Sequence, residues 1–119
     1  MKLSEIASVL EATSLIEGIE DHLNKEILTG GASDLMSDIL AGVSEGCVLL
    51  TGLTNIQVIR TAMISVVGAV IFVRGKTPPE DVIELARAEN IPIFSSPFSM
   101  FVSCGKLYNK GITGLDGSR

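Results

Sequence analysis

The chain has 119 residues, of which 46% are hydrophobic and 4% aromatic, and its formal net charge is −5. These values fit one domain of common size with an aliphatic core, and they argue against disorder. An acidic chain without a basic stripe also disfavours binding to nucleic acid or to an anionic membrane surface. Small anions remain open as ligands, because backbone amides at helix N-termini bind them locally whatever the net charge.

Targeting signals and cysteine content indicate the compartment. Residues 1–5 lack an apolar signal core, and the longest apolar stretch, 62–73, is shorter than the ~20 residues that a membrane-spanning helix needs. Cys47 and Cys104 lie far apart in apolar segments, which predicts buried, reduced thiols. We therefore expect a cytoplasmic protein with no metal site and no cofactor.

The spacing of apolar residues predicts the elements in chain order. A short helix over 3–11, a short strand at 14–16 and a polar loop over 20–25 come first. Four strand–helix units follow, with strands at 27–29, 48–51, 69–73 and 92–94. These strands are apolar on both faces, which is typical of strands covered by helices on both sides. The pattern predicts an α/β three-layer sandwich with a mostly parallel central sheet of four or five strands. We expect one domain over 1–112 and a flexible tail over 113–119.

The strand-to-helix loops of a parallel sheet all lie at its carboxyl edge, where ligands bind. In each single loop, turn and cap requirements explain the small and hydroxyl residues equally well. Four such loops on one edge favour a binding site that offers hydroxyls, amides and two cations to an anion. The candidate ligand-binding residues are Thr29, Gly30, Gly31, Ser33, Thr51, Thr54, Asn55, Arg74, Lys76, Ser95 and Ser96. Among them, Gly30 and Gly31 are predicted to form a tight turn with at least one positive φ.

No arrangement of residues indicates catalysis. Gly75, Lys76 and Thr77 open a helix after a strand, but a P-loop would need glycine where Val70 stands. Asp34 and Asp38 are four residues apart, a spacing typical of an exposed helix face. An enzyme that uses Asp34 or Lys76 is the least favoured hypothesis, and we expect no catalytic residues.

The order of the segments resembles the DRTGG domain family over about residues 3–112. The family's Thr-Gly-Gly corresponds to Thr29, Gly30 and Gly31, and the likeness continues through 55–56, 68–71 and 88–96. Asn24 and Lys25 replace the acidic–basic pair that precedes the glycines in the family. The resemblance implies a regulatory module without catalytic residues. Such modules occur alone, attached to phosphotransacetylases or CBS-domain pyrophosphatases, and in related form at the N-terminus of HPr kinases.

Two functions follow as hypotheses. The first is a regulatory domain that binds a small anionic ligand, a nucleotide or phosphorylated metabolite, and acts on a partner protein. The alternative is a ligand-free dimerisation or adaptor module. A homodimer is expected because two helices carry more apolar surface than one buried face uses. The extra apolar residues are Ile64 on one helix and, beside Phe98, Phe101 and Tyr108 on the last helix, a second stripe of Met100, Cys104 and Leu107.

Overall fold

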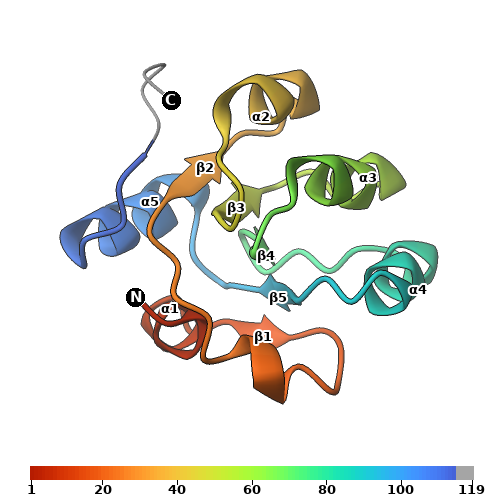
Figure 1. Ribbon diagram of the computed structural model, residues 1–119, viewed down its shortest axis with the longest axis horizontal. Coiled ribbons are helices and arrows are strands. Elements are labelled where there is room, and N and C mark those ends of the chain that lie inside the picture. Colours follow the sequence, from red (N-terminus) through yellow and green to blue (C-terminus); the bar gives the residue numbers. More distant parts are fainter. Residues whose placement is uncertain (115–119) are drawn as a thin grey trace.

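One five-stranded sheet lies between two layers of helices in the computed structural model, which describes residues 1–114 (Figure 1). In chain order the elements are α1 (Leu3–Val9), β1 (Thr13–Ser14), the 3-10 helix η1 (Glu20–His22), β2 (Gly30–Ala32), α2 (Met36–Gly42), β3 (Val48–Thr51), α3 (Ile56–Ser65), β4 (Ala69–Phe72), α4 (Glu80–Ala88), β5 (Ile93–Ser95) and α5 (Met100–Asn109). The predicted three-layer α/β fold is confirmed.

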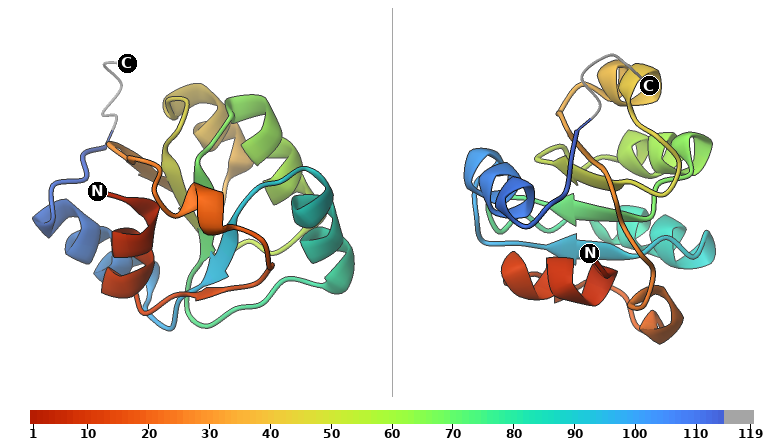
Figure 2. Two further views of the ribbon diagram at one scale, coloured as in Figure 1. Left: turned by 60° about the horizontal axis from the view of Figure 1, so that its bottom comes forward. Right: turned by 60° about the vertical axis from the view of Figure 1, so that its left-hand side comes forward.

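The strand order is β1-β5-β4-β3-β2, with β2 to β5 parallel and β1 antiparallel to β5. Because each parallel strand is added on the same side of the last one, and such crossovers are right-handed, α2, α3 and α4 cover one face. The helix that follows the last strand, α5, lies on the other face with α1 (Figure 2). Helices on both faces explain why every residue of β3 and β4 is buried.

The core is aliphatic, as the composition indicates, and includes one of the two cysteines. Cys47 is fully buried, which confirms its prediction, and this burial raises the pKa of its thiol to about 11. Cys104 is only half-buried, so the prediction that both thiols are buried is wrong for this residue. Both cysteines are free thiols. Within residues 1–114, no helix is long and apolar enough to cross a membrane.

The predicted turn at Gly30 and Gly31 is wrong, because both glycines belong to strand β2 and neither has a positive φ. A Cβ on Gly31 would lie 2.5 Å from Val43 Cγ1, and a Cβ on Gly30 would lie 3.3 Å from Ile112 Cγ2. Contact at 2.5 Å is closer than side-chain carbons approach one another. The glycines are therefore needed for close approach of the neighbouring segments and not for an unusual backbone angle.

The C-terminal segment runs beside the outer edge of β2. Thr113 donates its amide to the Leu28 carbonyl at 3.2 Å and accepts the Gly30 amide at 3.0 Å. Of the tail predicted over 113–119, residues 115–119 lie outside the described part of the chain.

The solvent-facing apolar residues of α5 are not those predicted. Leu107, together with the small Ser103, faces the sheet and is 2% exposed, whereas Phe101 is 89% and Tyr108 72% exposed. Hydrophobicity alone identifies two stripes on this helix but does not indicate which one the sheet covers. On α3, Ile64 is exposed, as predicted.

The close approach at Gly31 gives a test of the fold. Gly31→Ala should lower the free energy of unfolding by about 1–3 kcal/mol, the usual cost of an overpacked contact. The matched control is Gly42→Ala, because a Cβ on Gly42 meets nothing within 4 Å. It should be neutral or stabilising by up to about 1 kcal/mol, since alanine is the better helix former. Urea denaturation measures both changes, and an unchanged stability of Gly31→Ala would contradict the packing described.

Candidate functional site

Polar residues that follow three neighbouring strands meet at the carboxyl edge of the sheet. The Asp34 carboxylate, two residues after β2, accepts the Gly52 amide at 2.6 Å and the Thr51 hydroxyl at 3.2 Å. From the loop after β4, the Lys76 ammonium donates to the Gly52 carbonyl at 2.9 Å. Asp34, Thr51, Gly52 and Lys76, here called the Gly52 cluster, thus join three loops through one glycine.

Because Gly52 has no side chain, the Asp34 carboxylate and the Lys76 ammonium can both approach its backbone. A Cβ on this residue would lie 3.3 and 3.4 Å from the two Asp34 carboxylate oxygens and 3.7 Å from Lys76 Nζ. Gly52 itself is buried, whereas Asp34 is exposed and Lys76 half-buried. An ammonium has three N–H groups and a carboxylate about four lone-pair positions. The Gly52 cluster therefore keeps both donors and acceptors for a ligand.

Asp34 and Gly52 are the residues of this cluster that are absent from the predicted ligand-binding residues. The spacing of Asp34 from Asp38 indicated an exposed helix face, but α2 begins only at Met36, so Asp34 belongs to the loop. Its position directly after Ser33, the last residue of the predicted strand-to-helix loop, was the available signal.

Backbone hydrogen bonds join the loops after β4 and β5 at the carboxyl edge of the sheet. The helix after β4 covers one face of the sheet and the helix after β5 covers the other, which is the arrangement that opens a crevice in such folds. Here the Arg74 amide donates to the Phe98 carbonyl at 2.7 Å and the Gly75 amide to the Ser96 carbonyl at 2.6 Å. Arg74 and Gly75 have φ of 60° and 68°, so both are in the left-handed region. At Gly75 this conformation has no steric cost, because glycine lacks a Cβ. These amides are consequently unavailable to a ligand.

Two serines at the end of β5, Ser95 and Ser96, hold neighbouring loops in place. Ser95 donates its hydroxyl to the Lys76 carbonyl at 2.8 Å, which positions the loop that carries the ammonium. Ser96 is fully buried and donates its hydroxyl to the Leu10 carbonyl at 2.7 Å. Ser95 thus supports the Gly52 cluster, and Ser96 ties the sheet edge to the end of α1.

The other predicted site residues lie around the cluster or away from it. Ser33 accepts the Leu35 amide at 2.9 Å, and Asn55 caps α3 by accepting the Gln57 amide at 3.0 Å. Thr54 is half-buried beside Asn55. Thr29 precedes β2, at the opposite edge of the sheet, where its hydroxyl lies 2.9 Å from that of Ser44.

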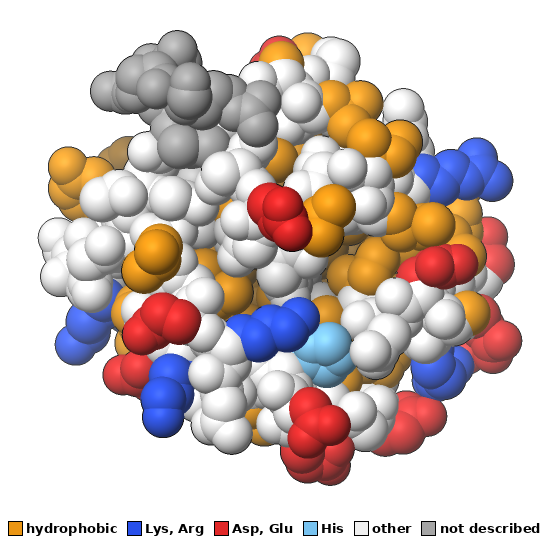
Figure 3. Space-filling model, in the orientation of Figure 1, with side chains coloured by type: hydrophobic (Ala, Val, Ile, Leu, Met, Phe, Trp, Pro, Cys, Tyr) orange, Lys and Arg blue, Asp and Glu red, His pale blue; other side chains and the backbone are white. Residues whose placement is uncertain are grey.

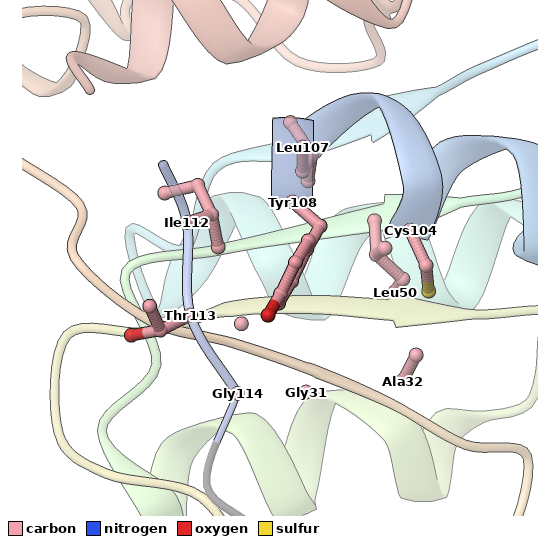
Figure 4. Close-up of a pocket in the computed structure, with 10 residues that line it drawn as sticks. Gly31, Ala32, Leu50, Cys104, Leu107, Tyr108, Ile112, Thr113 and Gly114 are labelled. Atoms are coloured by element: carbon pink, nitrogen blue, oxygen red, sulfur yellow. The ribbon is translucent and has the colours of Figure 1, made fainter. Parts of the chain in front are cut away.

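Two hollows flank the glycine strand β2, one on each face of the sheet. The hollow on the α5 side has a volume of about 160 Å³ and is lined by Leu50, Cys104 and Tyr108 among others (Figure 4). The hollow on the α2 side, of about 210 Å³, includes Ser33 and Asp38 in its wall. The bare strand borders both hollows, whereas the Gly52 cluster lines neither.

Charged side chains of the described residues can be compared with the requirements of metal and nucleic-acid sites. Figure 3 shows acidic and basic side chains interspersed over one face, without a continuous basic stretch. Within residues 1–114, no three His, Cys, Asp or Glu residues gather into a group that could hold a metal ion.

Comparison with known proteins gives a family and similar solved structures. The family model described as the DRTGG domain matches residues 5–107. The chain is also similar to the CBS and DRTGG domains of the regulatory region of Clostridium perfringens pyrophosphatase, complexed with the activator diadenosine tetraphosphate. That match has a TM-score of 0.71 and 20% identity, and it covers 98% of this chain but only 51% of the other. No curated protein matches the chain.

The bonds of Asp34 can be tested by substitution. Asp34→Ala removes the acceptor of the Gly52 amide and of the buried Thr51 hydroxyl, and should lower the free energy of unfolding by about 1–2 kcal/mol. Asp34→Asn keeps an acceptor oxygen and should lose less. The control Asp21→Ala removes an exposed carboxylate that has no side-chain bond within residues 1–114, and should change little. Equal stabilities of the Asp34 and Asp21 variants in chemical denaturation would refute the network.

Proposed function

The chain belongs to the DRTGG domain family, and from this premise we propose that it is a non-catalytic regulatory domain that binds a small anionic ligand. The ligand is a nucleotide or phosphorylated metabolite, and it binds at the carboxyl edge of the sheet. The observation that carries the proposal is the Gly52 cluster, in which Asp34 and Lys76 meet at one backbone residue. Binding changes how the domain acts on a partner protein.

The charges at this edge suit an anion that also carries hydroxyl groups. Arg74 and Lys76 lie in one loop and supply two positive charges against the single negative charge of Asp34, in a chain whose net charge is −5. An ammonium and a guanidinium bind phosphate oxygens by charge-assisted hydrogen bonds. Because Asp34 already occupies the Gly52 amide, the phosphate would be bound by these side chains. The free carboxylate oxygen would accept ligand hydroxyls.

The solved neighbour supports nucleotides as the class to test first. The pyrophosphatase region was solved with a dinucleotide activator, but the present chain spans about half of that protein. The family and the shared fold therefore support a regulatory role, whereas the position of the ligand in this chain rests on the Gly52 cluster alone.

The ligand proposal predicts a stabilised protein. Among nucleotides, sugar phosphates and acyl phosphates, at least one should raise the melting temperature, because a ligand at 100 times its Kd adds about 2.7 kcal/mol. Lys76→Met should raise the Kd of that ligand about tenfold or more, because the variant loses a charged hydrogen bond. Lys110→Met, at the far end of α5, is the matched control and should bind normally.

Two results would contradict this prediction. One is the absence of stabilisation by every class of ligand in the thermal-shift screen. The other is a ligand that binds the Lys76→Met and Lys110→Met variants equally well.

A second candidate function is dimerisation, which the exposed aromatic residues of α5 favour. Phe101 and Tyr108 border an open hollow of about 340 Å³ at Gly105, on the same helix. Glycine inside a helix costs about 1 kcal/mol relative to alanine, and a Cβ on Gly105 would meet no atom of residues 1–114 within 4 Å. A protruding ring beside a hollow is self-complementary, as a two-fold contact between two copies requires. We propose this face of α5 as the dimer contact.

Sedimentation velocity at high micromolar concentration tests the dimer. The unmodified protein should sediment as a dimer and Phe101→Glu as a folded monomer, because a carboxylate would be buried without a partner in the contact. Ile64→Glu places the same charge on the exposed face of α3 and should leave the dimer intact. A monomer for the unmodified protein, or dissociation by Ile64→Glu alone, would contradict the proposed contact.

A further inference from the structure

The hollow between β2 and α5 has the size of a single aromatic ring. Its volume is about 160 Å³, and apolar cavities of ~150 Å³ in proteins hold a benzene molecule. None of the residues that line it carries a charged side chain. A group that enters this space must therefore be small and uncharged.

Two walls of the hollow are flat. On one side lies the strand of Gly30, Gly31 and Ala32, whose side chains are no larger than a methyl group. From the other side the Tyr108 ring extends from α5 toward Gly31, with Cys104 and Leu50 beside it (Figure 4). Planar rings stack on aromatic faces, where their association is worth more than the buried area alone. The walls thus favour a planar ring over a branched aliphatic group.

The part of the β2 edge that residues 1–114 leave unpaired adds a donor and an acceptor to the rim of the hollow. Alternate residues of a strand direct their amide and carbonyl to the same side. Since the Gly30 amide points outward to Thr113, Ala32 points its N–H and C=O to the same open edge. Within residues 1–114 neither group of Ala32 has a hydrogen-bond partner. The N–H of Ala32 can donate to an acceptor atom of a ring, and its C=O can accept from a donor next to that atom.

We propose that the hollow between β2 and α5 binds an uncharged heteroaromatic ring of the nucleobase type. The ring lies between Tyr108 and the glycine strand, and its polar edge bonds to the Ala32 backbone. The site is separate from the Gly52 cluster and needs no phosphate.

Phosphate-free nucleosides test this site without involving the anionic one. Uridine or cytidine, whose bases are single rings, should raise the melting temperature of the protein. Each should also slow alkylation of Cys104 by iodoacetamide at least about tenfold, because a bound ring covers the sulfur in the pocket wall. Cys47 is fully buried, so alkylation measured by mass spectrometry reports on Cys104. Phenol has a ring of similar size without the adjacent acceptor and donor, and should give neither effect at the same concentration.

Substitution of Ala32 provides the matched comparison. Ala32→Leu places a side chain in the hollow from an exposed position, and should abolish the nucleoside-induced rise in melting temperature. Ala88→Leu makes the same change at an exposed position of α4, and this variant should still show the nucleoside-induced rise in melting temperature. If Ala32→Leu fails to fold, Cys104→Leu fills the hollow from the helix side. No effect of either nucleoside, an equal effect of phenol, or full binding by the filled variants would overturn the proposal. None of these outcomes bears on a ligand held through its phosphate by Lys76.

Discussion

The close packing of the two glycines of β2, Gly30 and Gly31, against neighbouring segments is the constraint on which the rest of the structure depends. Val43, directly after α2, occupies the space that a side chain on Gly31 would need, and Ile112 crowds Gly30 from the other side. Because β2 is bare, α2 and the C-terminal segment both lie close to the sheet edge. The same bareness leaves a hollow on each face of the strand. The close packing at this edge and the two hollows beside it thus both depend on Gly30 and Gly31.

At the carboxyl edge of the sheet, the backbone amides of Gly52, Arg74 and Gly75 are not free to bind an anion. The amides of Arg74, Gly75 and Gly52 are all used inside the protein, the last by the Asp34 carboxylate. An anion at this edge must therefore be recognised by the Lys76 ammonium and its neighbours, with the carboxylate of Asp34 beside it. Such a mixed site discriminates between anions, because a ligand without hydroxyl donors would face the carboxylate unsatisfied.

Much of the fold could be predicted from the sequence, because apolar runs such as Val48–Thr51 have few alternatives to a buried strand. The sequence could not show that Gly30 and Gly31 lie in a strand, because glycine occurs both in turns and where two segments pack closely. The choice between the two stripes of α5 depends on which face the sheet covers, which is tertiary information. Asp34 was missed because its role depends on a residue 18 positions away. Local patterns therefore predicted the elements, and long-range contacts determined the site.

Chemical-shift mapping of the backbone amides during a nucleotide titration tests the central claim most directly. The account predicts that the amides of Gly52, Leu53 and Lys76 shift together, with one Kd, while those on the outer face of α5 stay unchanged at fixed protein concentration. Shifts confined to the outer face of α5 around Gly105, or no shift with any nucleotide, would contradict a ligand site at the carboxyl edge.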